Sequence, residues 1–404
     1  MAGVDAFDLH LLLPKFDCGL CGNPICMTLA RNILSNIQKP VDCPFITLEN
    51  MKKINELIPT KDVVRKHPHP NVEDDIIEIH PCTEDGKVTL ETQLKSKTMN
   101  RDFYSDIFDS LQLCKSLSEV EIFDNRNCSK RMGYGLVEIK GKRVHIFKTG
   151  RIIMRRADDR EDALGTFSRL SNLLLPARIC SCGNILADCF GGSCETCSKD
   201  VCAAHLDHLE MTEAKDGIIT AEKILDKYDN KKNEKLANNF EDLRNIVDII
   251  RNIHEELNAG HEIDKESYKE EIDKIADNIN KICMENILNN KEKDETEIAL
   301  IQYGLARDLI RARDGFLSLE SIEDNKTYKT AAELFFDSYE AFEKKDVKAS
   351  KDVIKRYEEF KSTLETNSED VGIAKIATNG FYISRIFGKP LPRIKLHDVN
   401  KKIS

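Results

Sequence analysis

One stretch decides how the rest of this sequence is interpreted: Phe16-Asp17-Cys18-Gly19-Leu20-Cys21-Gly22-Asn23-Pro24-Ile25-Cys26, followed by Asp42-Cys43-Pro44. Its four cysteines have the spacing C-x2-C-x4-C-x16-C. Gly19 and Gly22 let the backbone turn tightly around a centre that several sulfurs hold. The residues that follow Cys26 predict a helix, and its N-terminus would point at that centre. The partial positive charge of a helix N-terminus suits an anionic cluster.

The cysteine spacing favours iron–sulfur chemistry over zinc. A tetrahedral zinc site usually shows two C-x2-C pairs, whereas this stretch has one such pair and two isolated cysteines. An iron–sulfur cage fits that pattern better. Four buried structural cysteines are the alternative interpretation, although cysteines seldom cluster in this way without chemistry.

The core D-C-G-x-C-G-x-P-x-C and the ending D-C-P resemble a small four-iron–four-sulfur domain. That domain occurs in the large subunit of the corrinoid iron–sulfur protein and in the B subunit of Rnf-type electron-transport complexes. The resemblance covers about the first 50 of the 404 residues. It implies a [4Fe–4S] cluster held by Cys18, Cys21, Cys26 and Cys43. It does not bring the corrinoid or flavin partners with it, because the remaining chain shows no barrel-like series of strand–helix repeats.

A second group of cysteines follows in the middle of the chain: Cys180, Cys182, Cys189, Cys194, Cys197 and Cys202. Six cysteines exceed what one tetrahedral centre needs, and two metal sites remain open. We favour a second [4Fe–4S] cluster with four of the six as ligands, because it would relay electrons from the first. The alternative is a structural zinc that pairs the Cys180/Cys182 turn with the Cys194-x2-Cys197 turn.

Composition limits the partners of the protein. The net charge of −10 argues against a general nucleic-acid binder. No run approaches the ~20 apolar residues that span a bilayer, and the N-terminus lacks a secretory signal. We therefore expect a cytoplasmic protein without a membrane span. In that location the 14 cysteines suggest metal binding more than disulfides. Four of them lie outside the two groups: Cys82, Cys114, Cys128 and Cys283.

Patterning predicts an α+β chain with an antiparallel sheet and a C-terminal helical bundle. The expected parts are a [4Fe–4S] domain at 1–58, a linker at 59–75, an α+β domain at 76–178, a Cys-rich metal-binding segment at 179–210 and a helical bundle domain at 217–404. In the α+β domain we expect strands at 76–79 and 87–91, a helix over 101–117, a three-stranded meander at 136–155 and a helix capped by Asp158 or Asp159. In the bundle we expect helices at about 220–228, 234–258, 264–290, 294–316, 326–344, 346–364 and 368–386.

No catalytic motif emerges: the sequence has no phosphate loop, no dinucleotide fingerprint and no nucleophile elbow. We therefore expect a non-catalytic iron–sulfur protein that transfers electrons in an anaerobic pathway such as methanogenesis. Its helical domain would dock a redox protein or a metalloenzyme complex. One alternative is an accessory factor for the reductive activation or maturation of a metalloenzyme, for example a corrinoid protein or methyl-coenzyme M reductase. The other is a redox-sensing structural or regulatory protein with structural zinc at the second site.

Overall fold

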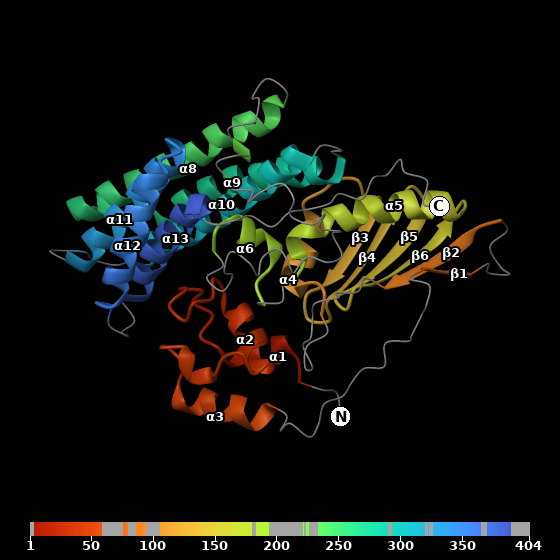
Figure 1. Ribbon diagram of the computed structural model, residues 1–404, viewed down its shortest axis with the longest axis horizontal. Coiled ribbons are helices and arrows are strands. Elements are labelled where there is room, and N and C mark those ends of the chain that lie inside the picture. Colours follow the sequence, from red (N-terminus) through yellow and green to blue (C-terminus); the bar gives the residue numbers. More distant parts are fainter. Residues whose placement is uncertain are drawn as a thin grey trace.

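A computed structural model of the chain describes residues 4–58, 76–79, 86–93, 106–179, 183–193, 221, 224–225, 233–289, 293–319, 322, 326–364 and 370–388. These residues form N-terminal helices, an antiparallel sheet and a C-terminal helical bundle (Figure 1). The predicted α+β class is therefore confirmed. The predicted linker at 59–75 lies outside the described residues. No helix in the described ranges is both long enough and apolar enough to cross a bilayer.

The N-terminal part holds the short helices α1 (Ala6–Leu12), α2 (Cys26–Leu34) and α3 (Leu48–Leu57) and the 3-10 turn η1 (Pro40–Asp42). Asp5 and Asp8 form a reciprocal capping box at the start of α1. The hydroxyl of Thr47 accepts a hydrogen bond from the Asn50 N–H and caps α3. The N-cap residue of α2, Ile25, makes no side-chain hydrogen bond to the helix. The first N–H groups of α2 are therefore available to other residues.

The described strands form one antiparallel sheet in the order β1-β2-β6-β5-β4-β3. The strands are β1 (Ile76–Ile79), β2 (Val88–Gln93), β3 (Asn125–Ser129), β4 (Tyr134–Ile139), β5 (Lys142–Phe147) and β6 (Arg151–Ala157). The predicted meander corresponds to β4, β5 and β6. Strand β3, which pairs with β4 at the sheet edge, was not expected, because its sequence Asn-Arg-Asn-Cys-Ser lacks the alternation typical of a strand.

Two helices cover the buried face of the sheet, which carries Val137, Val144 and Met154. Helix α5 (Arg160–Leu173) has Asp159 as its N-cap, and the Asp159 carboxylate accepts a hydrogen bond from the Asp162 N–H, in agreement with the predicted cap at Asp158 or Asp159. Helix α4 (Ser110–Ser118) starts later than the helix predicted over 101–117. The carboxylate of Asp109 accepts a hydrogen bond from the Gln112 N–H, while the Asp109 backbone N–H donates to the Ala177 carbonyl. Asp109 is therefore an N-cap, and residues 106–108 lie outside the helix.

The C-terminal bundle contains α8 (Glu234–Ala259), α9 (Lys265–Asn289), α10 (Lys293–Ser318), α11 (Lys326–Glu343), α12 (Val347–Lys361) and α13 (Asp370–Gly388). Each predicted helix from 234 onward is confirmed, with ends within three residues of those expected. The helix predicted at 220–228 lies largely outside the described residues.

Helix α13 lies at the centre of this bundle and packs on α10, α11 and α12 (Figure 1). Small residues allow the close approach. A Cβ atom on Gly380 would lie 2.7 Å from the Phe335 Cα, and one on Gly315 would lie 2.8 Å from the Gly372 carbonyl oxygen. The glycine-containing sequence of α13 thus reflects helix packing rather than an exposed interaction helix.

A buried ion pair joins the N-terminal part to the rest of the chain. The Arg31 guanidinium on α2 donates to the Asp109 carboxylate, and the two side chains are 1% and 3% exposed. The same guanidinium donates a second hydrogen bond of 2.9 Å to the Gly183 carbonyl oxygen. Asp109 therefore caps α4 and also pairs with Arg31, and α2 is tied to both α4 and the segment before α6 (Leu186–Phe190).

We predict that Arg31→Met lowers the free energy of unfolding by about 3–5 kcal/mol, because Asp109 keeps a buried carboxylate without its cation. Urea titration followed by circular dichroism measures this change. Arg31→Met/Asp109→Asn should recover part of the loss, since asparagine carries no charge and still caps α4. Lys53→Met, which removes an exposed pair with Glu49, is the control and should leave the midpoint unchanged. An equal midpoint for Arg31→Met and Lys53→Met would contradict the prediction.

Candidate cluster-binding site

Cys18, Cys21, Cys26 and Cys43 all line one small cavity, which has a volume of about 10 Å³. Cys18, Cys26 and Cys43 are each 7% exposed. The other lining residues are Pro14, Phe16, Asp17, Gly19, Asn23, Pro44 and Phe45. The structure thus brings together the four cysteines that the sequence singles out. Across the described ranges, no group of three or more His, Cys, Asp or Glu side chains is arranged to hold a single metal ion.

Tight turns and one carboxylate position the first three cysteines. Gly19 and Gly22 adopt positive φ angles of 77° and 79°, and the Gly22 N–H donates to the Gly19 carbonyl at 2.9 Å. The Asp17 carboxylate accepts a hydrogen bond of 2.6 Å from the Cys26 N–H. Because Cys26 is the first residue of α2, Asp17 satisfies one of the N–H groups that a helix start leaves unpaired.

A buried amide network fixes the loop that carries Cys21. The Asn23 side-chain amide donates to the Cys21 Sγ at 3.4 Å and to the Gln38 Oε1 at 2.7 Å. Gln38 in turn donates to the Cys21 carbonyl at 3.0 Å. Asn32 on α2 donates to both Asn23 and Gln38. An N–H group aimed at a cysteine sulfur stabilises negative charge on that sulfur, whether it belongs to a thiolate or to a cluster.

Burial keeps these thiols protonated when no cation is beside them. It raises the pKa of Cys18 to about 11, and the neighbouring Cys21 and Cys43 sulfurs add repulsion between thiolates. Burial also raises the pKa values of Cys26 and Cys43. Several thiolates in one buried cavity are stable only beside positive charge, which iron ions supply.

The helical bundle covers one side of this cavity. A Cβ atom on Gly19 would lie 2.3 Å from the Thr378 Cγ2 and 2.9 Å from the Tyr382 hydroxyl oxygen, both on α13. The Thr378 hydroxyl forms a 3.0 Å hydrogen bond with the Tyr357 hydroxyl of α12. The loop that holds Cys18 is therefore in direct contact with the bundle core, although nearly the whole chain separates the two in sequence.

Of the second cysteine group, the structure describes Cys189. It lies in α6 and is 2% exposed. Helix α6 packs on α10, and a Cβ atom on Gly191 would lie 2.9 Å from the Gly304 carbonyl carbon. The other five members, Cys180, Cys182, Cys194, Cys197 and Cys202, lie outside the described residues. The choice between a second [4Fe–4S] cluster and zinc therefore stays a prediction.

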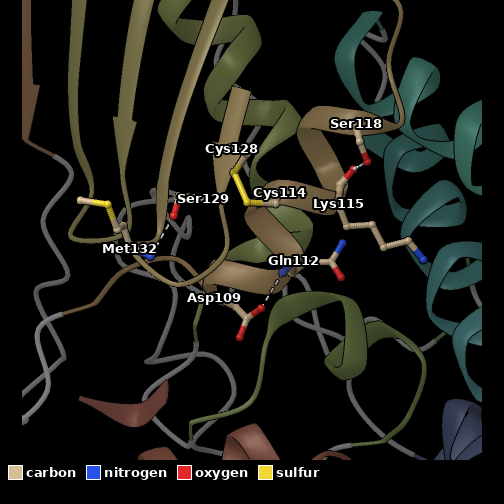
Figure 2. Close-up of a disulfide and its surroundings, with 8 residues drawn as sticks. All are labelled: Asp109, Gln112, Cys114, Lys115, Ser118, Cys128, Ser129 and Met132. Carbon is tan, nitrogen blue, oxygen red and sulfur yellow. Dashed lines mark hydrogen bonds between the residues drawn. A yellow bond between two sulfur atoms is a disulfide. The ribbon is translucent and has the colours of Figure 1, made fainter. Parts of the chain in front are cut away.

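Two of the scattered cysteines form a disulfide that the sequence did not reveal. Cys114 on α4 is bonded to Cys128 on β3 (Figure 2). Composition suggested metal binding more than disulfides for the cysteines as a whole, and this pair departs from that expectation. Its residues belong to a helix and to an unexpected strand, and no local spacing signals that the two elements meet. Cys283 is buried beside Asn239 and Gln302, and Cys82 lies outside the described residues.

Comparison with known proteins identifies the N-terminal region. Residues 13–45 match the family described as "Putative Fe-S cluster". The chain is 40% identical over 65 residues to the acetyl-CoA decarbonylase/synthase complex subunit gamma of Methanopyrus kandleri. It is 39% identical over 66 residues to the subunit of the same name from Methanocaldococcus jannaschii. These alignments cover 16% and 15% of this chain and 14% of each relative. No solved structure matches.

The predicted resemblance of the N-terminal domain is thereby confirmed, and the remainder of the chain is unrecognised. The matched residues 13–45 begin just before the cavity and end at Phe45 in its wall. The region that matches the family model therefore coincides with the cysteine-lined cavity rather than with the sheet or the bundle.

We predict that Gly19→Ala destabilises the protein more than Gly141→Ala does. Both glycines have nearly the same positive φ, but a Cβ atom at Gly141 meets nothing within 4 Å. Gly141→Ala should therefore cost about 1 kcal/mol, and Gly19→Ala about 1–3 kcal/mol more because it clashes with Thr378. Thermal unfolding measures both losses. Adding Thr378→Ser, which keeps the hydroxyl and removes the clashing methyl, should recover part of the difference. Equal losses for the two glycine variants would refute the close contact.

Proposed function

We propose that this protein transfers electrons through a [4Fe–4S] cluster held by Cys18, Cys21, Cys26 and Cys43. The observation that supports this most is that the four cysteines line one buried cavity inside the segment that matches an iron–sulfur family. When bound, such a cluster accepts and releases single electrons. The chain's own residues hold the four sulfurs, exclude water and aim the Asn23 amide at one sulfur.

Exposed apolar residues of the N-terminal part favour docking of a redox partner on that part itself. Among the described residues, six of the eight large exposed hydrophobic side chains lie there: Leu11, Phe16, Ile37, Val41, Leu48 and Leu57. Phe16 lines the cavity and packs edge-on against Phe45, and Val41 precedes Cys43 by two residues. Isolated exposed hydrophobics are common, whereas a concentration in one small part is typical of a protein-binding surface. The helical bundle contacts the loop that holds Cys18 through α13.

An accessory role in reducing a metalloenzyme is the second candidate. Its support is that both relatives are named as subunits of an enzyme complex, together with the exposed apolar residues beside the cavity. In this role the partner is a metalloenzyme subunit that receives the electron, and no free carrier is involved.

Anaerobic size-exclusion chromatography of a pull-down separates the two roles. A stable stoichiometric complex favours the accessory factor, and a transient, salt-sensitive contact favours the carrier.

We predict that anaerobically purified protein binds about four irons and four sulfides per chain at this site, and that Cys26→Ser loses most of them. Cys283→Ser, which changes a buried cysteine away from the cavity, is the matched control and should keep full iron content. About eight irons would indicate a second cluster at 180–202, whereas about four irons with one zinc would make that site structural. Electron paramagnetic resonance tests the function: the lack of a reducible cluster signal in iron-loaded protein would refute electron transfer.

We also predict that Asn23→Leu lowers the reduction potential of the cluster by a few tens of millivolts. The reduced cluster carries more negative charge than the oxidised one, so an N–H donor at a ligand sulfur stabilises the reduced state. Protein-film voltammetry measures this shift. Asn50→Leu, on the exposed helix α3, is the control and should leave the potential unchanged. A potential that is unaltered in Asn23→Leu at full iron content would show that this amide does not act on the cluster.

A further inference from the structure

A cavity of about 740 Å³ lies where the N-terminal part, the sheet domain and the helical bundle meet. This volume is in the range of small-molecule sites. Asp17 and Ile25, which flank the cluster cysteines, form one wall. Helix α4 and strand β3 form a second wall, and α10 contributes Arg307 and Arg311. The cavity therefore adjoins the proposed cluster site without containing its cysteines.

The Cys114–Cys128 disulfide is part of this cavity's wall. Figure 2 shows the sulfur–sulfur bond bridging α4 to β3, with the Lys115 side chain extending from the same helix. Cys128 is half-buried rather than enclosed in the core. Cys114 is 6% exposed, so a small molecule in the cavity would approach the disulfide from the Cys128 side.

Cationic side chains outnumber anionic ones in the lining of the cavity, although Glu119 behind the wall pairs with Lys115 and buried Asp188 pairs with Arg307 and Arg311. Its cationic members are Lys115, Arg126, Lys130, Arg307 and Arg311, and its anionic members are Asp17 and Asp109. Asp109 pairs with Arg31, and Asp17 accepts the Cys26 N–H. Arg307 and Arg311 are held by buried Asp188, whereas Arg126 and Lys130 are exposed on either side of Cys128. Cations beside a cysteine favour its thiolate, and a cationic cavity attracts anions.

The disulfide and the proposed cluster require cysteines in different oxidation states. Cluster ligation needs reduced cysteines, so a chain with such a cluster works where thiols are kept reduced. In those surroundings protein disulfides are usually transient, with catalytic or redox-sensing roles. A disulfide that faces a ligand-sized, cation-lined cavity fits such a transient role better than a purely structural one.

We propose that this cavity is a second redox site, in which Cys114 and Cys128 alternate between disulfide and dithiol and reduce a small anionic disulfide. The inference rests on the proposed function. A low-potential one-electron donor protein would supply two electrons in succession, and with two protons from solvent they would convert the disulfide into two thiols. Cys18, Cys21, Cys26 and Cys43 would hold the cluster that passes these electrons on. One thiolate then attacks the ligand's S–S bond and releases one ligand thiol. The other cysteine attacks the mixed disulfide, releases the second thiol and restores Cys114–Cys128.

The first experiment tests the electron route in full-length, iron-loaded protein under anaerobic conditions. Dithionite is added, thiols are alkylated at timed intervals, and peptide mass spectrometry quantifies the Cys114–Cys128 disulfide. We expect the disulfide to disappear as the cluster is reduced, and to persist in Cys18→Ser, which lacks an intact cage. A reduced cluster beside an intact disulfide would overturn the inference and leave the proposed function standing. The same rate of disulfide loss in Cys18→Ser would also overturn the route, whereas a protein without any reducible cluster would overturn both proposals.

The second experiment tests the ligand class without using the cluster. Protein in the dithiol form, freed of reductant, is mixed with oxidised glutathione, which is anionic, or with 2-hydroxyethyl disulfide, which is neutral. We expect Cys114–Cys128 to re-form faster with oxidised glutathione. Lys130→Gln, at an exposed position, should slow that reaction about tenfold and slow the neutral probe less, because the lost cation also favours the Cys128 thiolate. Cys283→Ser is the control and should change neither rate. Equal rates for both probes, or no effect of Lys130→Gln on the anionic one, would overturn the assignment.

Discussion

The buried ion pair between Arg31 and Asp109 is the constraint on which the arrangement of the parts depends. A cation in the interior requires a partner, and Arg31 has both the Asp109 carboxylate and the Gly183 carbonyl. Asp109 at the same time caps α4. One carboxylate thus fixes where α4 begins and where α2 lies against it. Since α2 begins at Cys26 and α4 carries Cys114, the position of this pair also sets the separation between the cysteine-lined cavity and the disulfide.

A series of buried polar side chains connects α4, which carries Asp109, to the helical bundle. Arg307 on α10 donates to Gln112 on α4, and Gln112 donates to the Tyr303 hydroxyl at 2.6 Å. Arg307 and Arg311 both contact Asp188 on α6. Buried charges are costly unless they are paired, so these contacts restrict how α4, α6 and α10 can lie relative to one another. The bundle therefore fixes the walls of the cavity that adjoins the cysteines.

The sequence was most informative where structure follows local rules. Apolar residues at helical spacing marked the bundle helices α8 to α13 closely, and turn residues marked the meander β4 to β6. The gathering of the four N-terminal cysteines followed from their spacing and the glycines between them. The sequence was least informative where a residue's role comes from a distant partner. The start of α4 at Ser110 depends on Arg31 and on the Ala177 carbonyl, and the disulfide depends on the pairing of β3 with β4. No periodicity in either segment encodes those contacts.

The contact between Gly19 and α13 has a consequence for biogenesis. Synthesis proceeds from the N-terminus, so the cysteine-bearing loop is complete long before Thr378 and Tyr382 leave the ribosome. During that interval the side of the loop that α13 later covers is open to solvent. Docking of α13 closes it late, because this contact joins residues that are far apart in sequence. If the loop holds the proposed cluster, iron and sulfide would have their easiest access to the nascent chain, and the finished protein would protect what had been inserted.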